Sequence, residues 1–289
     1  MQEFEFLRPK TLSGLLDVLA ETGGSILAGG TDIIPKMRRS QFAVSTLVDA
    51  TQIEELRFIR EQDGRIHIGA LTTHQEISES ALLAGVNPAL VAAARSVGCE
   101  QTRNRGTLGG NLANASPAAD TLPPLLIFDA DVHVLSKARK NTIPLDDFLV
   151  SPGKTMLNPG DVITQVSFEP FVGAWGVAFI KLGKRKGMAI SLVSAAAGIV
   201  LDPVGKISKA RLCLGSLAPK VVRSSGVEKI LLGKLPTPEI LEQAAQACLE
   251  DISPISDVRS TADYRRHSAV VVACRVLAQA VEEANRRFA

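Results

Sequence analysis

The sequence contains few aromatic residues and few cysteines. Its 289 residues include one Trp, one Tyr, ten Phe and four Cys. With so few rings, a surface on which nucleic-acid bases stack is not expected. No two of the cysteines stand in a C-x-x-C spacing, so we expect neither a zinc nor an iron–sulfur site in this chain. The four could form two disulfides, but in a cytosolic chain free buried thiols are expected instead. The four are Cys99, Cys213, Cys248 and Cys274.

Long apolar runs and an excess of one charge are also absent. No apolar run approaches the ~18 residues that suggest a membrane span, and the N-terminal "MQEFEFLRPK" has no secretory-signal pattern. The 32 basic and 30 acidic side chains form no basic stripe, which argues against a nucleic-acid partner. Apolar residues make up 46%, enough for a sizeable core. These features predict a cytoplasmic protein of about two domains or one large one.

Hydrophobic periodicity predicts helices and strands in alternation up to about residue 170, and a different arrangement after it. Expected helices cover 12–20 and 87–98, the latter with Asn87 as N-cap and Pro88 in its first turn. Expected strands cover 25–30, 46–50, 64–73 and 125–136, and 99–120 is expected to be a loop. Beyond 170, strands within 175–183, 190–202 and 210–218 precede helices over 238–252 and 261–288, a pattern typical of an α+β layer.

The first glycine pair stands in "SILAGGTDII", residues 25–34. A strand that enters Gly29, Gly30, Thr31 and Asp32 offers consecutive backbone N–H groups with little steric cover, which can form an anion-binding nest. The alternative is a tight turn capped by Thr31 or Asp32. The segment is neither a P-loop nor a G-x-G-x-x-G motif.

The second glycine pair stands in "RGTLGGNLANASPAAD", residues 105–120. Gly109 and Gly110 would let the backbone approach a large ligand closely. Several neighbouring side chains can hydrogen-bond a polar ligand, namely Thr107, Asn111, Asn114, Ser116 and Asp120. The alternative is a surface loop held by Asx and Ser/Thr turns.

Taken together, "AGGTDIIPKM" and "TLGGNLANASPAADTLPPLL" resemble the two FAD-binding signatures of the flavoprotein (medium) subunit of molybdenum hydroxylases, the xanthine dehydrogenase and carbon monoxide dehydrogenase family. The segments 179–197 and 257–280 are similar to later parts of that subunit, so the resemblance covers about residues 2–285. It implies an α+β chain. A two-subdomain FAD-binding fold of the vanillyl-alcohol oxidase (PCMH) type would cover 1–172, split near 55–60, and an α+β domain with a three-stranded antiparallel sheet would cover 173–289.

The resemblance also implies the FAD-binding residues. The first glycine turn would surround the FAD pyrophosphate with backbone amides and hydroxyls, without lysine or magnesium, through Ile26, Leu27, Ala28, Gly29, Gly30, Thr31, Asp32 and Ile33. The second motif would contact the pyrophosphate, ribityl chain and flavin through Thr107, Leu108, Gly109, Gly110, Asn111, Asn114, Ser116 and Asp120. Other family positions that line FAD correspond to Val97, Ile190 and Lys209.

The assembly implied by the resemblance is a heterotrimer, paired as a dimer of heterotrimers. A large molybdenum-cofactor subunit would hydroxylate substrate. Two two-iron two-sulfur clusters in a small subunit would pass electrons to FAD in this chain, and from there to NAD, oxygen or another acceptor. This chain would then be an oxidoreductase subunit with no catalytic acid–base residue and no metal of its own. The sequence of this chain does not indicate the substrate of the whole enzyme or its electron acceptor.

Some residues allow two interpretations. The histidines, His67, His74, His133 and His267, show no ligand spacing and are expected at the surface or in packing. The basic run "KLGKRKG", 181–187, is either a solvated hairpin or a docking patch or cofactor contact. This chain lacks the cysteines for the four-iron cluster of some relatives, and "RKGMAIS" is less acidic than the segment of animal xanthine oxidases.

Two other functions stay open at this point. One is a free-standing flavoenzyme of the same superfamily, similar to the reductase of UDP-N-acetylenolpyruvoylglucosamine. The other is a bridging subunit that has lost FAD. The run "NASPAADTLPPLL" and the closing helix favour an electron-transfer subunit over a free-standing flavoenzyme. The intact glycine turns and Asp120 argue against a bridging subunit that has lost FAD.

Overall fold

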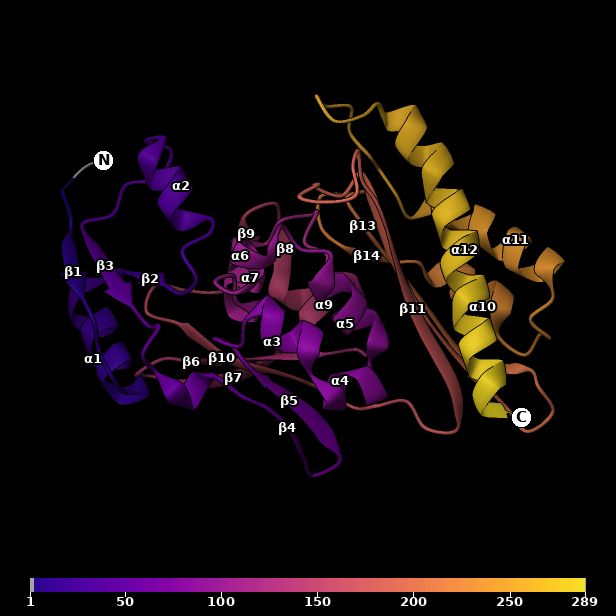
Figure 1. The fold of residues 1–289 in the computed structure, drawn as a ribbon, viewed down its shortest axis with the longest axis horizontal. Coiled ribbons are helices and arrows are strands. Elements are labelled where there is room, and N and C mark those ends of the chain that lie inside the picture. The colour runs from indigo at the N-terminus through magenta and orange to yellow at the C-terminus, as the bar shows by residue number, and fades with distance from the viewer. Residues whose placement is uncertain (1–2, 289) are drawn as a thin grey trace.

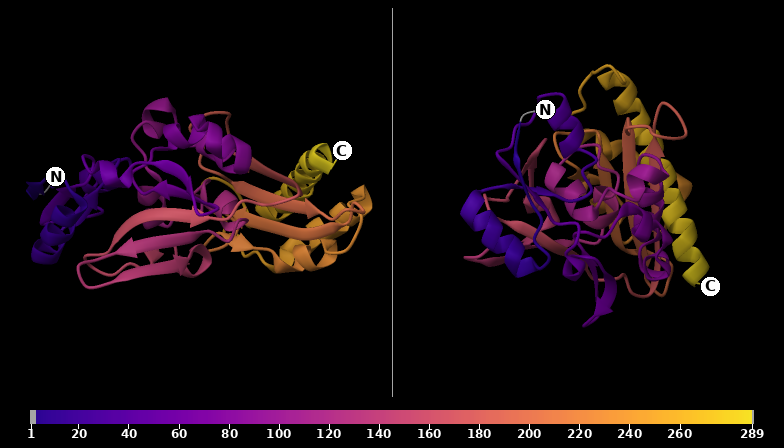
Figure 2. Two further views of the ribbon diagram at one scale, coloured as in Figure 1. Left: turned by 90° about the horizontal axis from the view of Figure 1, so that it is seen from below. Right: turned by 60° about the vertical axis from the view of Figure 1, so that its left-hand side comes forward.

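The computed structural model describes residues 3–288. Three sheet-containing parts follow one another along the long axis of the molecule, from the N-terminal part to the C-terminal helix (Figures 1 and 2). The first and second parts fall within 1–172, and the third falls within 173–289, the division that we propose for the domains.

The N-terminal part is a small parallel sheet with a helix between its first two strands. Its strands are β1 (Glu5–Leu7), β2 (Ser25–Leu27) and β3 (Thr46–Asp49), in the order β1-β3-β2. The helices are α1 (Leu12–Thr22) and the short α2 (Ile33–Arg38). Helix α1 begins where the Thr11 side chain accepts a hydrogen bond from the Gly14 amide, and it ends at Gly23 in the left-handed conformation. The expected helix over 12–20 and strand at 46–50 are confirmed, and 25–30 forms the short strand β2, which ends at Leu27 and runs into a turn.

The second part is an antiparallel sheet in the order β4-β5-β10-β6-β7. Its strands are β4 (Ile59–Gln62), β5 (Arg65–Gly69), β6 (Asp131–Leu135), β7 (Lys140–Pro144) and β10 (Val162–Phe168). The segments between β5 and β6 form α3 (His74–Glu79), α4 (Ala81–Val86), α5 (Pro88–Arg95), α6 (Glu100–Arg103), α7 (Leu108–Asn114) and α8 (Leu122–Leu126). The remaining elements are the 3-10 turn η1 (Glu54–Leu56), α9 (Leu145–Phe148), β8 (Leu149–Ser151) and β9 (Lys154–Thr155).

Some of the helices and strands predicted from the sequence of this part are confirmed and others are not. Asn87 caps α5 as expected, since its side chain accepts from the Leu90 amide at 3.0 Å. The expected loop over 99–120 is wrong, because α6 and α7 lie there. Helix α7 was not expected because glycine, at positions 109 and 110, has a low helix propensity. The helix is stabilised by its Thr107 N-cap and by the complete burial of Leu108 and Leu112. The expected strand over 125–136 is too long, since α8 ends at Leu126 and β6 starts at Asp131.

The C-terminal part is an antiparallel sheet in the order β11-β12-β13-β14. Its long strands are β11 (Ala174–Leu182), β12 (Val193–Leu201) and β13 (Ile207–Gly215). The expected count of three strands misses β14 (Val222–Arg223), whose two residues are too short for a periodic pattern. Helices α10 (Ser225–Leu231), α11 (Pro238–Ala247) and α12 (Ala262–Phe288), with the 3-10 turn η2 (Cys248–Glu250), complete it; α10 was not expected.

Both faces of this sheet are buried. Ala195, Ala197 and Ile199 of β12 pack with the C-terminal helices, whereas Ala196 packs with the core of the second part. The long helix α12 crosses the sheet on the outer face (Figure 1). Successive side chains of β12 point to opposite faces of the sheet, and because both faces are buried, the sequence of β12 is a continuous apolar run.

Other expectations concern cysteine and membrane segments. All four cysteines are free; Cys213 and Cys248 are buried, and Cys99 and Cys274 are half-buried. None of the helices between residues 3 and 288 is both long and apolar enough to cross a membrane.

Candidate functional site

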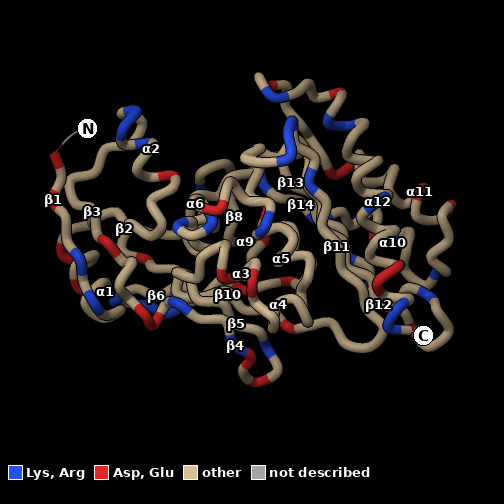
Figure 3. The backbone as a smooth tube through the Cα atoms, viewed as in Figure 1, with Lys and Arg blue, Asp and Glu red and all other residues tan. Residues whose placement is uncertain are grey.

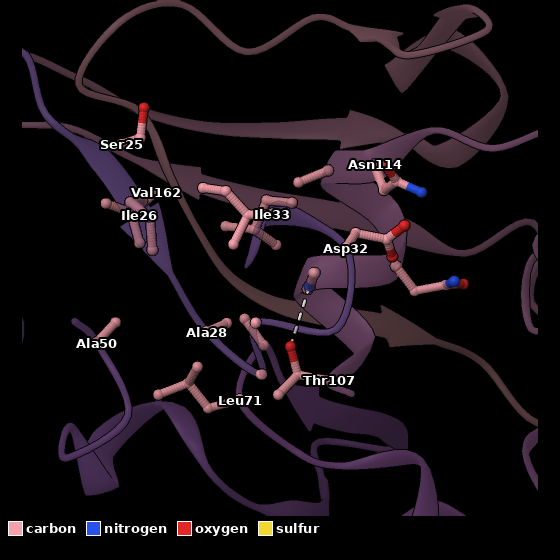
Figure 4. Close-up of a pocket in the computed structure, with 18 of the residues that line it drawn as sticks. Ser25, Ile26, Ala28, Asp32, Ile33, Ala50, Leu71, Thr107, Asn114 and Val162 are labelled. Atoms are coloured by element: carbon pink, nitrogen blue, oxygen red, sulfur yellow. Dashed lines mark hydrogen bonds between the residues drawn. The ribbon is translucent and has the colours of Figure 1, made fainter. Parts of the chain in front are cut away.

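A cleft of about 600 Å³ lies between the N-terminal part and the second sheet (Figure 4). One wall is the turn after β2 and the start of α2, and the facing wall is the start of α7. Residues 157–163, which lead into β10, close a third side. The chain segments of the two glycine motifs, about 80 residues apart in sequence, are thereby brought to the same cavity.

Most of the residues predicted to bind a cofactor line this cleft. They are Ile26, Ala28, Gly29, Gly30, Thr31, Asp32, Ile33, Val97, Thr107, Gly109, Gly110, Asn111 and Asn114. The predicted residues that do not line it are Leu27, Leu108, Ser116, Asp120, Ile190 and Lys209.

The first glycine turn exposes a row of free backbone donors. Within residues 3–288, the N–H groups of residues 29–33 donate no hydrogen bond to a backbone or side-chain acceptor. Asp32, at the N-cap position of α2, forms no side-chain cap, so the simple capped-turn alternative does not hold. Since these donors belong to residues that line the cleft, a bound anion can satisfy them, as the nest interpretation predicts.

The two glycines of this turn are required for the packing and the conformation of the backbone. A Cβ atom on Gly29 would overlap the backbone carbonyl of Arg105, in the loop before α7. Gly30 has a φ of 74°, a left-handed conformation that glycine adopts without strain. Gly29 thus lets the two motifs approach each other, and Gly30 permits the left-handed turn that leads into α2.

The second motif has its amides already satisfied. The amides of Leu108 and Gly109 donate to the carbonyls of Thr72 and Ala70 at 2.9 and 2.8 Å. The Gly110 amide donates to Thr107 Oγ1 at 3.1 Å, the bond drawn in Figure 4. A Cβ atom on Gly110 would meet only Thr107 Oγ1, at 3.0 Å. A Cβ atom on Gly109 would overlap Ala70, so this glycine lets α7 pack closely against the residue after β5. This wall therefore contributes no free N–H groups from these residues.

Several further polar residues line the cleft that the sequence analysis did not assign to it, and two of them, Lys36 and His74, bear on the binding of an anion or a cofactor. Lys36, in α2, donates from Nζ to Asn114 Oδ1 at 2.6 Å, so it joins the two walls. It forms no ion pair within residues 3–288, so its charge is free to meet an anion. The sequence analysis expected phosphate binding without lysine, and it did not include Lys36 among the cofactor-binding residues; that expectation stays a prediction. Its place in the cleft could have been predicted from the sequence, because Lys36 lies one helical turn after Ile33, which was assigned to the cofactor.

The second such residue is His74, which is 3% exposed and lies beside the loop before α7. Its backbone amide donates to the Gly106 carbonyl at 2.9 Å, and its Nδ1 has no hydrogen-bond partner in the described chain. Burial, reinforced by the Arg103 guanidinium, lowers the pKa of His74 to about 4, so the ring is neutral at pH 7. His74 is buried, in agreement with the expected packing role, and it also lines the cleft, a position that the sequence analysis did not predict.

The cleft suits a dinucleotide cofactor such as FAD. Its lining includes the apolar residues Leu15, Leu19, Ala50, Leu56, Leu71 and Val162, which fit an aromatic ring system. It also includes the residues with the free amides, 29–33, and the Lys36 ammonium, which fit a diphosphate. The donor set and the volume agree with this interpretation.

The predicted residues outside the cleft have other contacts. Asp120 is buried, accepts hydrogen bonds from Ser191 and from Lys181 Nζ at 2.5 Å, and so joins the second part to the C-terminal sheet. Burial raises the pKa of Asp120, although the Lys181 ammonium opposes this. Lys209 Nζ lies 4.7 Å from the centre of the Phe171 ring, and the Ile190 side chain is exposed.

The fold and the cleft together define the class of the chain, a protein that binds a dinucleotide cofactor between two subdomains. Family comparisons are specific on this point. Residues 2–169 match the FAD binding domain in molybdopterin dehydrogenase, and residues 178–280 match the CO dehydrogenase flavoprotein C-terminal domain. The chain belongs to the family of FAD-binding (medium) subunits of the molybdenum-dependent xanthine and carbon monoxide dehydrogenases, and FAD is its cofactor.

Relatives match over almost the whole chain. The xanthine dehydrogenase FAD-binding subunit of Escherichia coli O157:H7 is 31% identical and covers 97% of both chains. The carbon monoxide dehydrogenase medium chain of Hydrogenophaga pseudoflava is 30% identical and covers 95% of this chain and 96% of its own. Among solved structures, carbon monoxide dehydrogenase from H. pseudoflava superposes with a TM-score of 0.93 at 29% identity, over 98% of each chain. The resemblance and the α+β fold inferred from the sequence are confirmed.

Proposed function

We propose that this chain accepts electrons from iron–sulfur clusters of a partner subunit and passes them to NAD, oxygen or another acceptor. The observation that carries the proposal is the row of free amides at residues 29–33, which faces the start of α7 across a cleft in a chain of this family. Bound FAD supplies the redox chemistry, and the protein binds and orients it.

The residues divide the work of holding FAD. The amides of residues 29–33 and the Lys36 ammonium would hold the diphosphate. Gly110 and Asn111 would contact the opposite side of the cofactor, and the neutral His74 ring would supply a further hydrogen bond. The apolar end, with Leu71 and Val162, would take one of the ring systems and exclude water from it. No residue of this chain is assigned an acid–base step.

The proposed assembly is a heterotrimer with a large molybdenum-cofactor subunit and a small iron–sulfur subunit, paired as a dimer of heterotrimers. Relatives carry names of subunits, such as the 6-hydroxypseudooxynicotine dehydrogenase complex subunit alpha of Paenarthrobacter nicotinovorans, 32% identical over 283 residues. The substrates in the relatives' names differ, from xanthine to carbon monoxide and nicotinate, so the partner subunits set the substrate of the complete enzyme. The cytoplasmic location inferred from the sequence stays a prediction.

The test is isolation of the tagged chain from its native host, with an absorption spectrum and metal analysis of the eluate. Flavin bands together with two co-purifying partners, molybdenum and iron would support the proposal. A yellow protein that elutes alone and oxidises NADH would instead indicate a free-standing flavoenzyme. A colourless protein that elutes with partners would indicate a bridging subunit.

A further inference from the structure

Helix α12 contains an arginine that is almost completely buried. The Arg265 side chain is 2% exposed, and Figure 3 shows acidic and basic residues close together where this helix begins. Its Nη2 donates to Asp257 Oδ1 at 2.9 Å, and its Nη1 donates to the Ser216 carbonyl at 3.0 Å. Its Nε has no hydrogen-bond partner within residues 3–288. The guanidinium is therefore held by one carboxylate and by one backbone carbonyl, which lies 49 residues earlier in the sequence.

The Asp257 carboxylate compensates the charge of this arginine. It also accepts hydrogen bonds from the Arg259 side chain, and these bonds, with the charges of both arginines, hold the pKa of Asp257 well below its usual range. Asp257 is therefore ionised at pH 7. Because a buried ion pair adds little stability over apolar side chains of the same size, the bond to the Ser216 carbonyl indicates a role in placing that residue.

Ser216 follows the end of β13 in a conformation that serine rarely adopts. Its φ is 65°, in the left-handed region, where a residue with a side chain is strained. Its amide donates to the Pro117 carbonyl at 2.8 Å, and its carbonyl accepts from Arg265. Both backbone polar groups of Ser216 are thus in use, one toward the second part of the molecule and one toward α12.

Pro117 lies in segment 115–120, which follows α7 directly. The last residue of α7 is Asn114, which lines the cleft. The next residue, Ala115, has a φ of 44°, so strained backbone begins where the wall of the cleft ends. Strained backbone keeps its conformation only where its surroundings fix it, and the bond from Ser216 fixes the segment two residues later. The place of Asn114 in the cleft therefore depends on a contact from the C-terminal part.

We propose that Arg265 is a positioning residue for FAD binding: by holding Ser216, it fixes segment 115–120 and with it the wall of the cleft that α7 forms. The inference rests on the proposed place of FAD in this cleft. Arg265 does not line the cleft, so it acts through the segment and makes no contact with the cofactor. The C-terminal part thereby has a role in a site whose lining residues all precede residue 164.

The test compares variants of the full chain after removal and re-addition of FAD. Arg265→Met removes both bonds, Arg265→Lys keeps the charge, and Arg287→Met is the control. Arg287 lies on the same helix and also donates to a backbone carbonyl, that of Trp175 at 2.9 Å, at the opposite end of the C-terminal sheet from Ser216. Fluorescence titration at low and at high salt gives the dissociation constant of FAD, and thermal unfolding of the FAD-free chain gives the stability.

Arg265→Met is expected to bind FAD about tenfold more weakly, and equally so at low and at high salt, because it displaces a wall of the cleft and removes no charge from the diphosphate site. Arg265→Lys should lose less, because its ammonium can keep one of the two bonds. Arg287→Met should bind FAD as the unaltered protein does, at whatever cost in stability.

Unchanged FAD affinity of a folded Arg265→Met variant would overturn the inference. So would a loss confined to low salt, or a loss that Arg287→Met shares. If Arg265→Met does not fold, Arg265→Lys decides: a severalfold loss is expected, and unchanged affinity contradicts the proposal. A loss in Gly110→Ala without one in Arg265→Met would overturn this inference alone, whereas no loss in either variant would also place FAD outside the cleft.

Discussion

The two glycine motifs look alike in sequence, but they build opposite kinds of wall. The turn at residues 29–33 leaves its amides free, whereas the amides at residues 108–111 are bonded to Thr72, Ala70 and Thr107. The first pair of glycines is required by the chain, through the approach to Arg105 and a left-handed φ. In the second pair, Gly109 is also required by the chain, because a Cβ atom there would overlap Ala70, whereas a Cβ atom on Gly110 would meet only Thr107 Oγ1, at 3.0 Å. The comparison teaches that two similar Gly-Gly pairs can differ in hydrogen bonding, since the N–H groups of one segment stay free and those of the other are satisfied within the chain.

The largest effect is expected from Gly29→Ala. The added methyl group would overlap the Arg105 carbonyl, so the two walls must separate. We expect a loss of stability of about 3 kcal/mol or more, together with loss of FAD. Thermal unfolding and flavin content measure both. The matched control is Gly85→Ala in α4, where a Cβ atom would meet nothing within 4 Å. Equal stability of the Gly29 variant and the unaltered protein would contradict the proposed contact.

The next effect concerns His74, between the two walls. Its pKa of about 4 lies below the ordinary 6.5, so between these values the unfolded chain binds a proton at this residue that the folded chain does not. The free energy of unfolding should therefore decrease as the pH falls from 6.5 to 4, by up to about 3 kcal/mol.

His74→Gln should flatten this pH dependence, measured by urea unfolding of the FAD-free protein at several pH values. The control is His267→Gln, which alters an exposed histidine of α12. An equally steep dependence in the His74 variant would show that other groups cause it.

Gly110→Ala tests the second wall separately from the fold. Its methyl group would meet only Thr107 Oγ1, at 3.0 Å, so unfolding should shift by about 1 kcal/mol or less. If FAD lies against this backbone, its affinity should fall about tenfold. Fluorescence titration of the FAD-free protein measures this. Retention of full affinity would place FAD away from Gly110.

The smallest effect is expected from Lys36→Met. Lys36 is exposed and its charge adds to the free amides, so FAD affinity should fall severalfold at low salt and less at high salt. The control is Lys10→Met, outside the cleft. A loss that does not depend on salt would mean that the lysine acts through its bond to Asn114 rather than through its charge.

Sequence patterns predicted helices and strands correctly wherever a local signal, such as an N-cap residue, agreed with the pattern of buried residues. Asn87 with Pro88 correctly predicted the start of α5, and the alternation of Ile66 and Ile68 correctly predicted β5. The expected strand over 64–73 was too long, since β5 ends at Gly69. Sequence patterns failed where tertiary contacts overrule propensity, as in α7, whose glycines would be poor helix formers alone. Asp120 was expected to contact the cofactor, and the structure gives it Lys181 and Ser191 as partners, which are 61 and 71 residues away in sequence.

By itself, the sequence determined the family, the cofactor and the segments that form the cleft, because glycine pairs with their flanking residues have few conformations and a specific chemistry. Only the tertiary structure decided which amides stay free, which glycines are packed against other parts of the chain, and that Lys36 and His74 line the cleft. The physical reason is that hydrogen-bond satisfaction and steric clearance depend on partners from distant parts of the chain.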